Sequence, residues 1–272
     1  MWEGHWSLTN DPFTGAGGPY VKTSGHDEAV ARLSDSIETG QRLAVIRAAA
    51  GMGKSVVLAR VYAETRGPNR RFAKVSGPVD GPAMITGLAA GLGVVVPSGG
   101  SRSAAWKALA DGIKLCRWQK LQAVLVIDDC QSLEEGADRR DLQRLSHLDP
   151  NPSTRLTVVQ SFRESDGEDE ESPTADPTPA WQLVIRLAPL TRSETERFVK
   201  EKLAAAGRTD PAFTPRSLSR LHDLSGGVPR GIDRLGSLSL MAAAVRGLEL
   251  VTPDVVDGVA RECTLPWPVF AA

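Results

Sequence analysis

The sequence predicts an α/β fold in which helices cover both faces of a parallel sheet, followed by a small all-α lid domain. Three observations indicate this architecture. Strand-like and helix-like segments alternate over residues 26–188, several of the strands are apolar on both faces, and from residue 189 onward the pattern is helical only. Strands without a polar face are typical of parallel sheets buried between two layers of helices.

The elements follow one another in a regular order. Residues 1–25 contain Gly, Pro and Trp and are predicted to be an irregular lead-in. An amphipathic helix is expected near Asp27–Glu38, where apolar residues recur at helical spacing. Short apolar runs predict strands at residues 42–48, 70–77, 121–129, 154–161 and 181–187. Helices are predicted between them at residues 54–65, 82–94, 104–120 and 139–148.

An acidic insertion and a helical segment complete the domain plan. Seven carboxylates lie between Glu164 and Asp176, so residues 164–179 cannot bury a core and are predicted to be a disordered insertion in the first domain, residues 26–188. The second domain, residues 189–272, is predicted to contain helices at residues 191–207, 215–227, 229–247 and 252–263. Thr191 or Ser193 is placed to cap the first of these, and Gly207 to end it.

The composition is that of an ordinary globular protein, with 41% hydrophobic and 24% charged residues and a net charge of −1. Without the acidic insertion the rest of the chain is mildly basic, which is compatible with a nucleic-acid partner. The three cysteines lie far apart and are predicted to be free thiols in a reducing compartment. No signal peptide and no apolar run of about 20 residues is present, so a cytoplasmic location without membrane insertion is expected.

The stretch AAAGMGKS, residues 48–55, lies between a predicted strand and a predicted helix, which is the context of a phosphate-binding loop. Backbone N–H groups at a helix N-terminus point at a bound anion, and Gly51 and Gly53 let the backbone approach it. Lys54 can reach the terminal phosphates, and the Ser55 hydroxyl can bind Mg²⁺. Ala48 stands where such loops have their first glycine, a position that contributes no side chain to the phosphates. The residues expected to bind nucleotide here are Ala49, Ala50, Gly51, Met52, Gly53, Lys54, Ser55 and Val56. The alternative is a helix that contains Gly-Lys-Ser by chance.

Two adjacent carboxylates end the apolar strand VLVIDD, residues 124–129. Such a pair is costly beside a buried strand unless an ion or partner is present. Asp128 is predicted to hold Mg²⁺ through water, and Asp129 to polarise the water that attacks the phosphate. Asp129 is one methylene shorter than a Glu in the same role would be. A strand that ends in a solvated turn is the alternative.

These motifs, together with DPF (residues 11–13), SGHDEAVARL (24–33), LAPLTRSETERFVKEKLAAAG (187–207) and LSGGVPRGIDRLGSLSLMAA (224–243), resemble AAA+ ATPases. Within that group the chain is similar to the bacterial ExeA/GspA-type ATPases and to transposition ATPases of the TniB/TnsC kind. The resemblance covers nearly the whole chain. The loop and the Asp pair are shared by P-loop NTPases in general, whereas the order and spacing of the last two stretches are more specific.

The resemblance implies roles for residues outside the two motifs. Arg230 in GVPR would be the second sensor, an arginine of the lid that contacts the terminal phosphates. The first sensor would be Gln160 or Ser161, at the end of the fourth strand. His26 would line the base pocket, although such a histidine can instead cap a helix. The arginine that relatives carry just before the fifth strand is not evident, which leaves Arg163 as the candidate for a finger that acts on the neighbouring subunit.

Three functions are compatible with these residues. The first is an ATPase that binds ATP and Mg²⁺, hydrolyses ATP and acts as an oligomeric switch in a transposition, DNA-related or secretion assembly. The second is a nucleotide-gated binding module with slow or absent hydrolysis, which Asp129 and the missing finger favour. The third, a small-molecule kinase, is disfavoured by the helical lid. Secretion relatives join this module to a membrane segment and a wall-binding domain, and transposition relatives are free-standing. Neither of these two parts is evident in the sequence, so the chain architecture favours the transposition relatives, whereas the local motifs favour the secretion relatives.

Overall fold

The computed structural model describes residues 2–14, 20–96, 100–133, 136–145, 147–148, 151, 153–164 and 183–263. Nearly all of the predicted acidic insertion, from residue 165 on, lies outside these ranges. The chain divides into two compact units. The sheet unit comprises residues 28–50 and 57–187, and the helical unit comprises residues 1–27, 51–56 and 188–272.

The sheet unit contains five parallel strands in the order β2-β3-β4-β1-β5. The strands are β1 Leu43–Ala48, β2 Arg70–Ser76, β3 Gln122–Asp128, β4 Leu156–Arg163 and β5 Leu183–Arg186. All seven residues of β3 are buried, as a strand in the middle of a covered sheet should be. Because the strands are parallel, their carboxyl ends share one edge of the sheet, where Ser76 pairs with Asp128 and Ala48 with Arg163. The predicted parallel sheet is confirmed.

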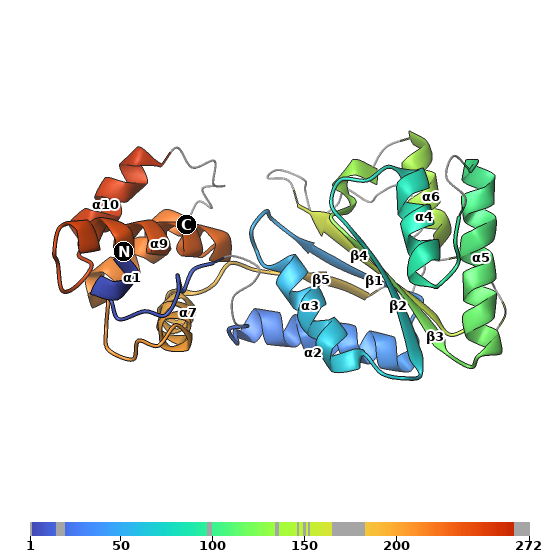
Figure 1. The fold of residues 1–272 in the computed structure, drawn as a ribbon, viewed down its shortest axis with the longest axis horizontal. Coiled ribbons are helices and arrows are strands. Elements are labelled where there is room, and N and C mark those ends of the chain that lie inside the picture. The colour runs from blue at the N-terminus through green and yellow to red at the C-terminus, as the bar shows by residue number, and fades with distance from the viewer. Residues whose placement is uncertain are drawn as a thin grey trace. The chain divides into compact units, whose positions relative to one another are not determined.

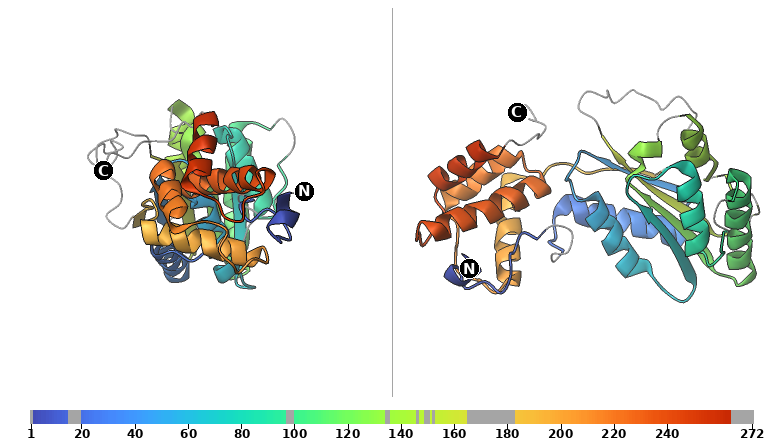
Figure 2. Two further views of the ribbon diagram at one scale, coloured as in Figure 1. Left: turned by 90° about the vertical axis from the view of Figure 1, so that its left-hand side faces the viewer. Right: turned by 45° about the horizontal axis from the view of Figure 1, so that its top comes forward.

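Helices cover both faces of this sheet, as Figures 1 and 2 show. The helices α2 (Ser24–Thr39) and α3 (Lys54–Thr65) run along one face, and α4 (Gly81–Gly91), α5 (Arg102–Trp118) and α6 (Gly136–Leu145) along the other. A short 3₁₀ helix, η1 (Cys130–Leu133), follows β3. The apolar core lies between the sheet and α4 to α6, and includes Met84, Leu88, Leu109, Ile113 and Leu125. Each of these five side chains is fully buried.

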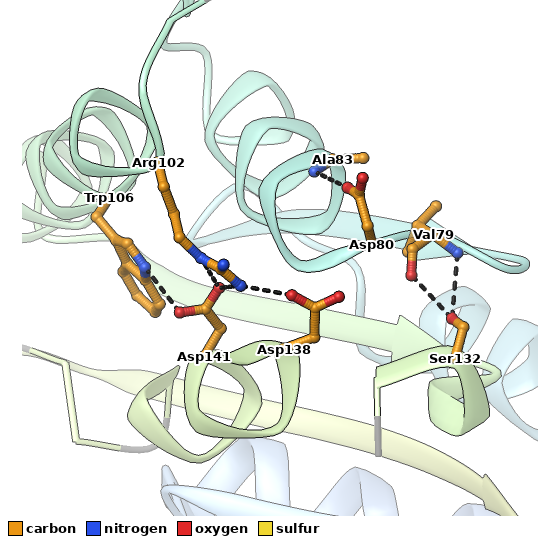
Figure 3. A network of polar contacts seen from close by, with 8 residues as sticks. All are labelled: Val79, Asp80, Ala83, Arg102, Trp106, Ser132, Asp138 and Asp141. Atoms are coloured by element: carbon orange, nitrogen blue, oxygen red, sulfur yellow. Dashed lines mark hydrogen bonds and ion pairs between the residues drawn. The ribbon is translucent and has the colours of Figure 1, made fainter. Parts of the chain in front are cut away.

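Polar contacts connect the helices on the second face (Figure 3). The Arg102 guanidinium of α5 donates to Asp141 Oδ2 over 2.6 Å and also to Asp138, both on α6. Trp106 Nε1 donates to the second oxygen of Asp141 over 3.2 Å. One arginine and one indole therefore satisfy the Asp141 carboxylate, which is buried between the two helices.

A second pair of contacts in Figure 3 holds the loop between β2 and α4. Asp80 caps α4, because its Oδ1 accepts the N–H of Ala83 over 2.8 Å. The hydroxyl of Ser132 in η1 donates to Val79 O over 2.8 Å and accepts Val79 N–H over 3.3 Å. The segment that follows the two aspartates is thus bonded to the backbone of the β2–α4 loop.

The helical unit contains α1 (Trp2–His5), α7 (Arg192–Ala205), α8 (Pro215–Ser225), α9 (Pro229–Val245) and α10 (Pro253–Glu262). Thr191 caps α7 in a reciprocal capping box with Glu194. The N-terminal residues Trp6 and Phe13 belong to the core of this unit. Their segment, predicted to be irregular, includes the single-turn helix α1. None of the helices in the described ranges is long and apolar enough to cross a membrane.

Candidate functional site

The predicted phosphate loop connects the end of β1 at Ala48 to the start of α3 at Lys54. Gly51 and Gly53 both have left-handed backbone conformations, with φ of 82° and 91°. Both also lie against other segments of the helical unit. A Cβ on Gly51 would come within 2.8 Å of Arg230 Cβ, and one on Gly53 within 2.7 Å of His26 Nε2. The loop therefore needs glycine at both positions, because the backbone is left-handed there and because a Cβ would have no room.

His26 lies in the first turn of α2 and touches this loop. Its side chain is only 7% exposed. The Nε2 atom lies 2.8 Å from the carbonyl oxygen of Met52, and Nδ1 lies 2.5 Å from the hydroxyl of Thr23. Since a carbonyl can only accept, the imidazole proton on Nε2 must be the donor to Met52.

Arg230 occupies the start of α9, next to the same loop. Its backbone N–H donates to Gly51 O over 3.2 Å. The helix opens with Pro229 after the extended residue Val228, which has no side-chain cap. The Arg230 side chain is exposed, so its guanidinium is accessible to a phosphate.

The two aspartates lie at the carboxyl end of β3 and are organised by one serine of β4. The Ser161 hydroxyl donates to Asp128 Oδ1 over 2.7 Å and accepts the backbone N–H of Asp129 over 2.8 Å. Asp128 is buried, whereas Asp129 is exposed and has a left-handed backbone with φ of 70°. The Nζ atom of Lys74, a residue of β2, lies 3.8 Å from the other oxygen of Asp128.

Two further predicted residues, Gln160 and Arg163, are on β4. Gln160 is buried, and its Nε2 lies 3.4 Å from Leu142 O. Arg163, by contrast, is the exposed last residue of the strand. Of the two positions predicted for the first sensor, Ser161 is the one that contacts the aspartates. Lys74 gave no sequence signal, because a single basic residue in a strand resembles any solvated lysine.

Ser55 and Asp128 each carry an oxygen group of the kind that magnesium binds. Mg²⁺ prefers hard oxygen ligands and usually binds through one or two protein groups together with phosphate oxygens and water. Ser55 offers an exposed hydroxyl in the first turn of α3, and Asp128 offers a carboxylate whose orientation is fixed by Ser161. These are the two residues that the sequence singled out for the metal.

Comparisons with known proteins give one family match and many structural matches. A family model described as an AAA domain matches residues 37–163. General secretion pathway protein A of Aeromonas hydrophila is 27% identical over 274 residues, covering 96% of this chain and 48% of that protein. The chain therefore spans about half the length of this curated relative.

Two solved structures show the same fold over most of the chain. Cdc6p of Pyrobaculum aerophilum matches with a TM-score of 0.71 and 18% identity, covering 94% of this chain and 71% of that one. The ORC2 protein of Aeropyrum pernix, solved as ADPNP–ADP complexes, matches with a TM-score of 0.68 and 15% identity, covering 94% and 72%. At these identities the similarity establishes the fold alone.

Proposed function

We propose that this chain, which carries an AAA domain and has the fold of AAA+ P-loop ATPases, binds ATP with Mg²⁺ and hydrolyses it. One observation carries the proposal. The chain leaves β1 into a glycine loop shaped for an anion, while β3 ends in the aspartate pair at the same edge of the sheet. Only β4 lies between β1 and β3 in the sheet, and β4 supplies Ser161, which contacts the aspartates. The ADPNP–ADP complexes of the similar ORC2 protein also support a nucleotide ligand.

Each residue has a defined task in this reaction. Loop N–H groups and the Lys54 amine bind the β- and γ-phosphates of ATP. Ser55 and Asp128 are the residues that would hold Mg²⁺, which when bound neutralises charge on those phosphates. Asp129 orients the water for in-line attack on the γ-phosphate, and Ser161 fixes the backbone that carries Asp129. The exposed guanidinium of Arg230 adds positive charge at the leaving phosphates.

Thermal unfolding with and without ATP tests the nucleotide site. At a free ATP concentration about a hundred times Kd, binding should raise the free energy of unfolding by about 2.7 kcal/mol. Lys54→Ala should remove this stabilisation. Lys114→Ala, at an exposed lysine of α5 that pairs with Asp111, should retain it. A wild-type melting temperature that does not change at saturating ATP and Mg²⁺ would rule the proposal out.

A second candidate function is a nucleotide-gated module with slow hydrolysis. The observation that favours it is Asp129 itself, whose carboxylate is one methylene shorter than Glu and whose backbone is held in a left-handed conformation. Steady-state phosphate release, measured with and without DNA, separates the two candidates. If hydrolysis is slow because the Asp129 side chain is too short to reach the attacking water, Asp129→Glu should raise the rate of ATP hydrolysis. Fast wild-type turnover that Asp129→Asn abolishes would favour the ATPase over the nucleotide-gated module.

The wider role that we propose is an ATP-dependent oligomeric switch in a macromolecular assembly. The name of the Aeromonas hydrophila relative supports a secretion assembly, and the resemblance to transposition ATPases supports a DNA-related one. Light scattering with ATP, in the presence and absence of duplex DNA, tests assembly and the DNA partner together. A neighbouring gene for a transposase or for a secretion component would indicate which assembly is served.

A further inference from the structure

Two successive carbonyl groups of the phosphate loop are held by donors from other segments of the helical unit. Gly51 O accepts the backbone N–H of Arg230 over 3.2 Å. Met52 O accepts the Nε2 proton of His26 over 2.8 Å. Both donors lie outside the loop in sequence, so tertiary structure contributes to the loop conformation.

These two contacts fix the direction of the N–H groups that follow. A peptide group is planar and trans, so its C=O and N–H point in opposite directions. Holding Gly51 O therefore orients the N–H of Met52 to the other side, and holding Met52 O does the same for the N–H of Gly53. Successive N–H groups that converge on one side of a loop form a concave site for an anion.

We propose that His26 is a positioning residue that fixes the phosphate loop in its anion-binding conformation, and that it does not recognise the nucleotide base. The inference rests on the proposed nucleotide binding. A histidine that recognises a base must either present a ring nitrogen to it or expose a ring face on which the base can stack. Both ring nitrogens of His26 are instead engaged by protein atoms, Nε2 by Met52 O and Nδ1 by the Thr23 hydroxyl, and the ring is buried.

The ring has a fixed support and a matching space. Glu194 of α7 accepts hydrogen bonds from the backbone N–H and the hydroxyl of Ser24, over 3.0 and 2.6 Å, at the start of α2. The helix that carries His26 is therefore anchored to α7. Gly53 leaves room for the ring, because a Cβ at this position would lie only 2.7 Å from His26 Nε2. His26 consequently connects α7 to the loop through a short chain of contacts.

Ligand binding to His26→Ala tests the inference, with ATP, GTP and inorganic tripolyphosphate as probes. If His26 acts through the loop, affinity for all three should fall by one common factor, about tenfold or more for a lost hydrogen bond to a buried acceptor. His26→Gln, whose amide can donate to Met52 O, should recover part of the loss. A histidine that reads adenine would instead weaken ATP alone and change the ratio of ATP to GTP affinity, which would overturn the proposal.

Two further variants keep the result interpretable. His222→Ala removes a half-buried histidine of α8 whose Nδ1 contacts Thr195 over 2.9 Å, and should leave the affinity for all three probes unchanged. If His26→Ala does not fold, Thr23→Val removes the Nδ1 partner while the ring stays, and should lower the three affinities together by a smaller factor. Unchanged affinities in folded His26→Ala would overturn the inference while leaving the ATPase proposal intact. A wild-type protein that binds none of the probes would overturn both.

Discussion

At the scale of single residues, Ser161 is the residue that contacts both aspartates at the end of β3. Its side chain is fully buried, and its hydroxyl serves Asp128 as a donor and the Asp129 backbone as an acceptor. A left-handed backbone costs a residue other than glycine roughly 1–2 kcal/mol, although aspartate tolerates it better than most. The hydrogen bond from Asp129 N–H to the Ser161 hydroxyl offsets part of that cost and holds the Asp129 backbone in place.

Ser161→Ala should therefore lower the rate of phosphate release more than it lowers the affinity for ATP. Loss of the hydroxyl leaves a buried carboxylate oxygen and an N–H without their partner, which costs about 1–3 kcal/mol of stability. Steady-state hydrolysis and urea unfolding measure the two effects. Ser161→Thr keeps a hydroxyl at the same position and serves as the control. A folded Ser161→Ala protein with a wild-type rate would show that Ser161 has no part in the reaction.

The residues of the two motifs could be predicted, because their chemistry depends on local order. A glycine loop between a strand and a helix, and two aspartates at the end of an apolar strand, are visible in a single sequence. Contacts between distant segments are not. Nothing near His26 in sequence indicates that its ring meets Met52. Which of Gln160 and Ser161 contacts the aspartates depends on the side-chain directions of β4, which the sequence does not show.

At the scale of elements, Glu194 supports two helices at once. It completes the capping box of α7 with Thr191 and accepts hydrogen bonds from Ser24 at the start of α2. Burial of the carboxyl opposes its ionisation, but the hydrogen bonds from Ser24 and Thr191 outweigh burial and lower the pKa of Glu194 from 4.5 to about 2. A lowered carboxyl pKa contributes stability that is present above about pH 4.5 and is lost as the pH falls toward 2.

Glu194→Gln should consequently cost about 1 kcal/mol of stability at pH 7, the usual effect of losing a helix cap. The difference from wild type should shrink as the pH is lowered from 4.5, because protonation removes the same charge from the native protein. Urea unfolding at pH 7, 4.5 and 3.5 measures this trend. Glu201→Gln changes an exposed glutamate of the same helix, 3.8 Å from Arg197, and should show little effect at any pH. An equal deficit for Glu194→Gln at all three pH values would contradict the assignment.

The N-terminal lead-in is an element of the helical core, which its composition did not reveal. Trp6 is 1% exposed, its Nε1 donates to Leu240 O over 2.9 Å, and the Arg208 guanidinium lies over its ring. The sequence predicted α7 and gave Thr191 or Ser193 as its cap, because capping is local, and Thr191 is the residue that caps it. It placed β4 two residues too early at each end, since Phe162 and Arg163 continue the pairing with β1. The end of a strand depends on a partner strand that is distant in sequence. The burial of Trp6 likewise depends on a distant segment, the helix α9 that contains Leu240.

Trp6→Ala should destabilise the helical unit by about 3–5 kcal/mol, the usual cost of removing a large buried aromatic side chain. Trp118 provides the matched control, because its side chain at the end of α5 is 81% exposed. Trp118→Ala should change stability by less than about 0.5 kcal/mol. Denaturant unfolding followed by far-UV circular dichroism compares the two. Similar losses for both variants would show that the lead-in is not part of the core.

At the scale of the whole molecule, we propose that the reaction depends on a second copy of the chain. Arg163 is exposed at the carboxyl edge of the sheet, where β4 ends beside β1. The carboxylate of Glu164, which follows it, is 3.1 Å from Arg186 of β5. Glu164 therefore forms its ion pair with Arg186 of β5. An exposed guanidinium at this edge suits a role on the nucleotide of a neighbouring subunit.

This role predicts that hydrolysis requires assembly and that two inactive variants complement each other. Arg163→Ala should bind ATP but hydrolyse it more slowly by a factor on the order of 10³, the lower range for loss of an arginine finger. Lys54→Ala should not bind ATP, yet it retains Arg163. In mixed assemblies a Lys54→Ala subunit can present its arginine to ATP held by an Arg163→Ala neighbour, so the mixture should hydrolyse ATP faster than the sum of its parts. Arg186→Ala, mixed with Lys54→Ala in the same way, controls for effects of removing any arginine at this edge. A mixture no faster than that sum, at concentrations where light scattering shows oligomers, would mean that Arg163 does not act across a subunit boundary.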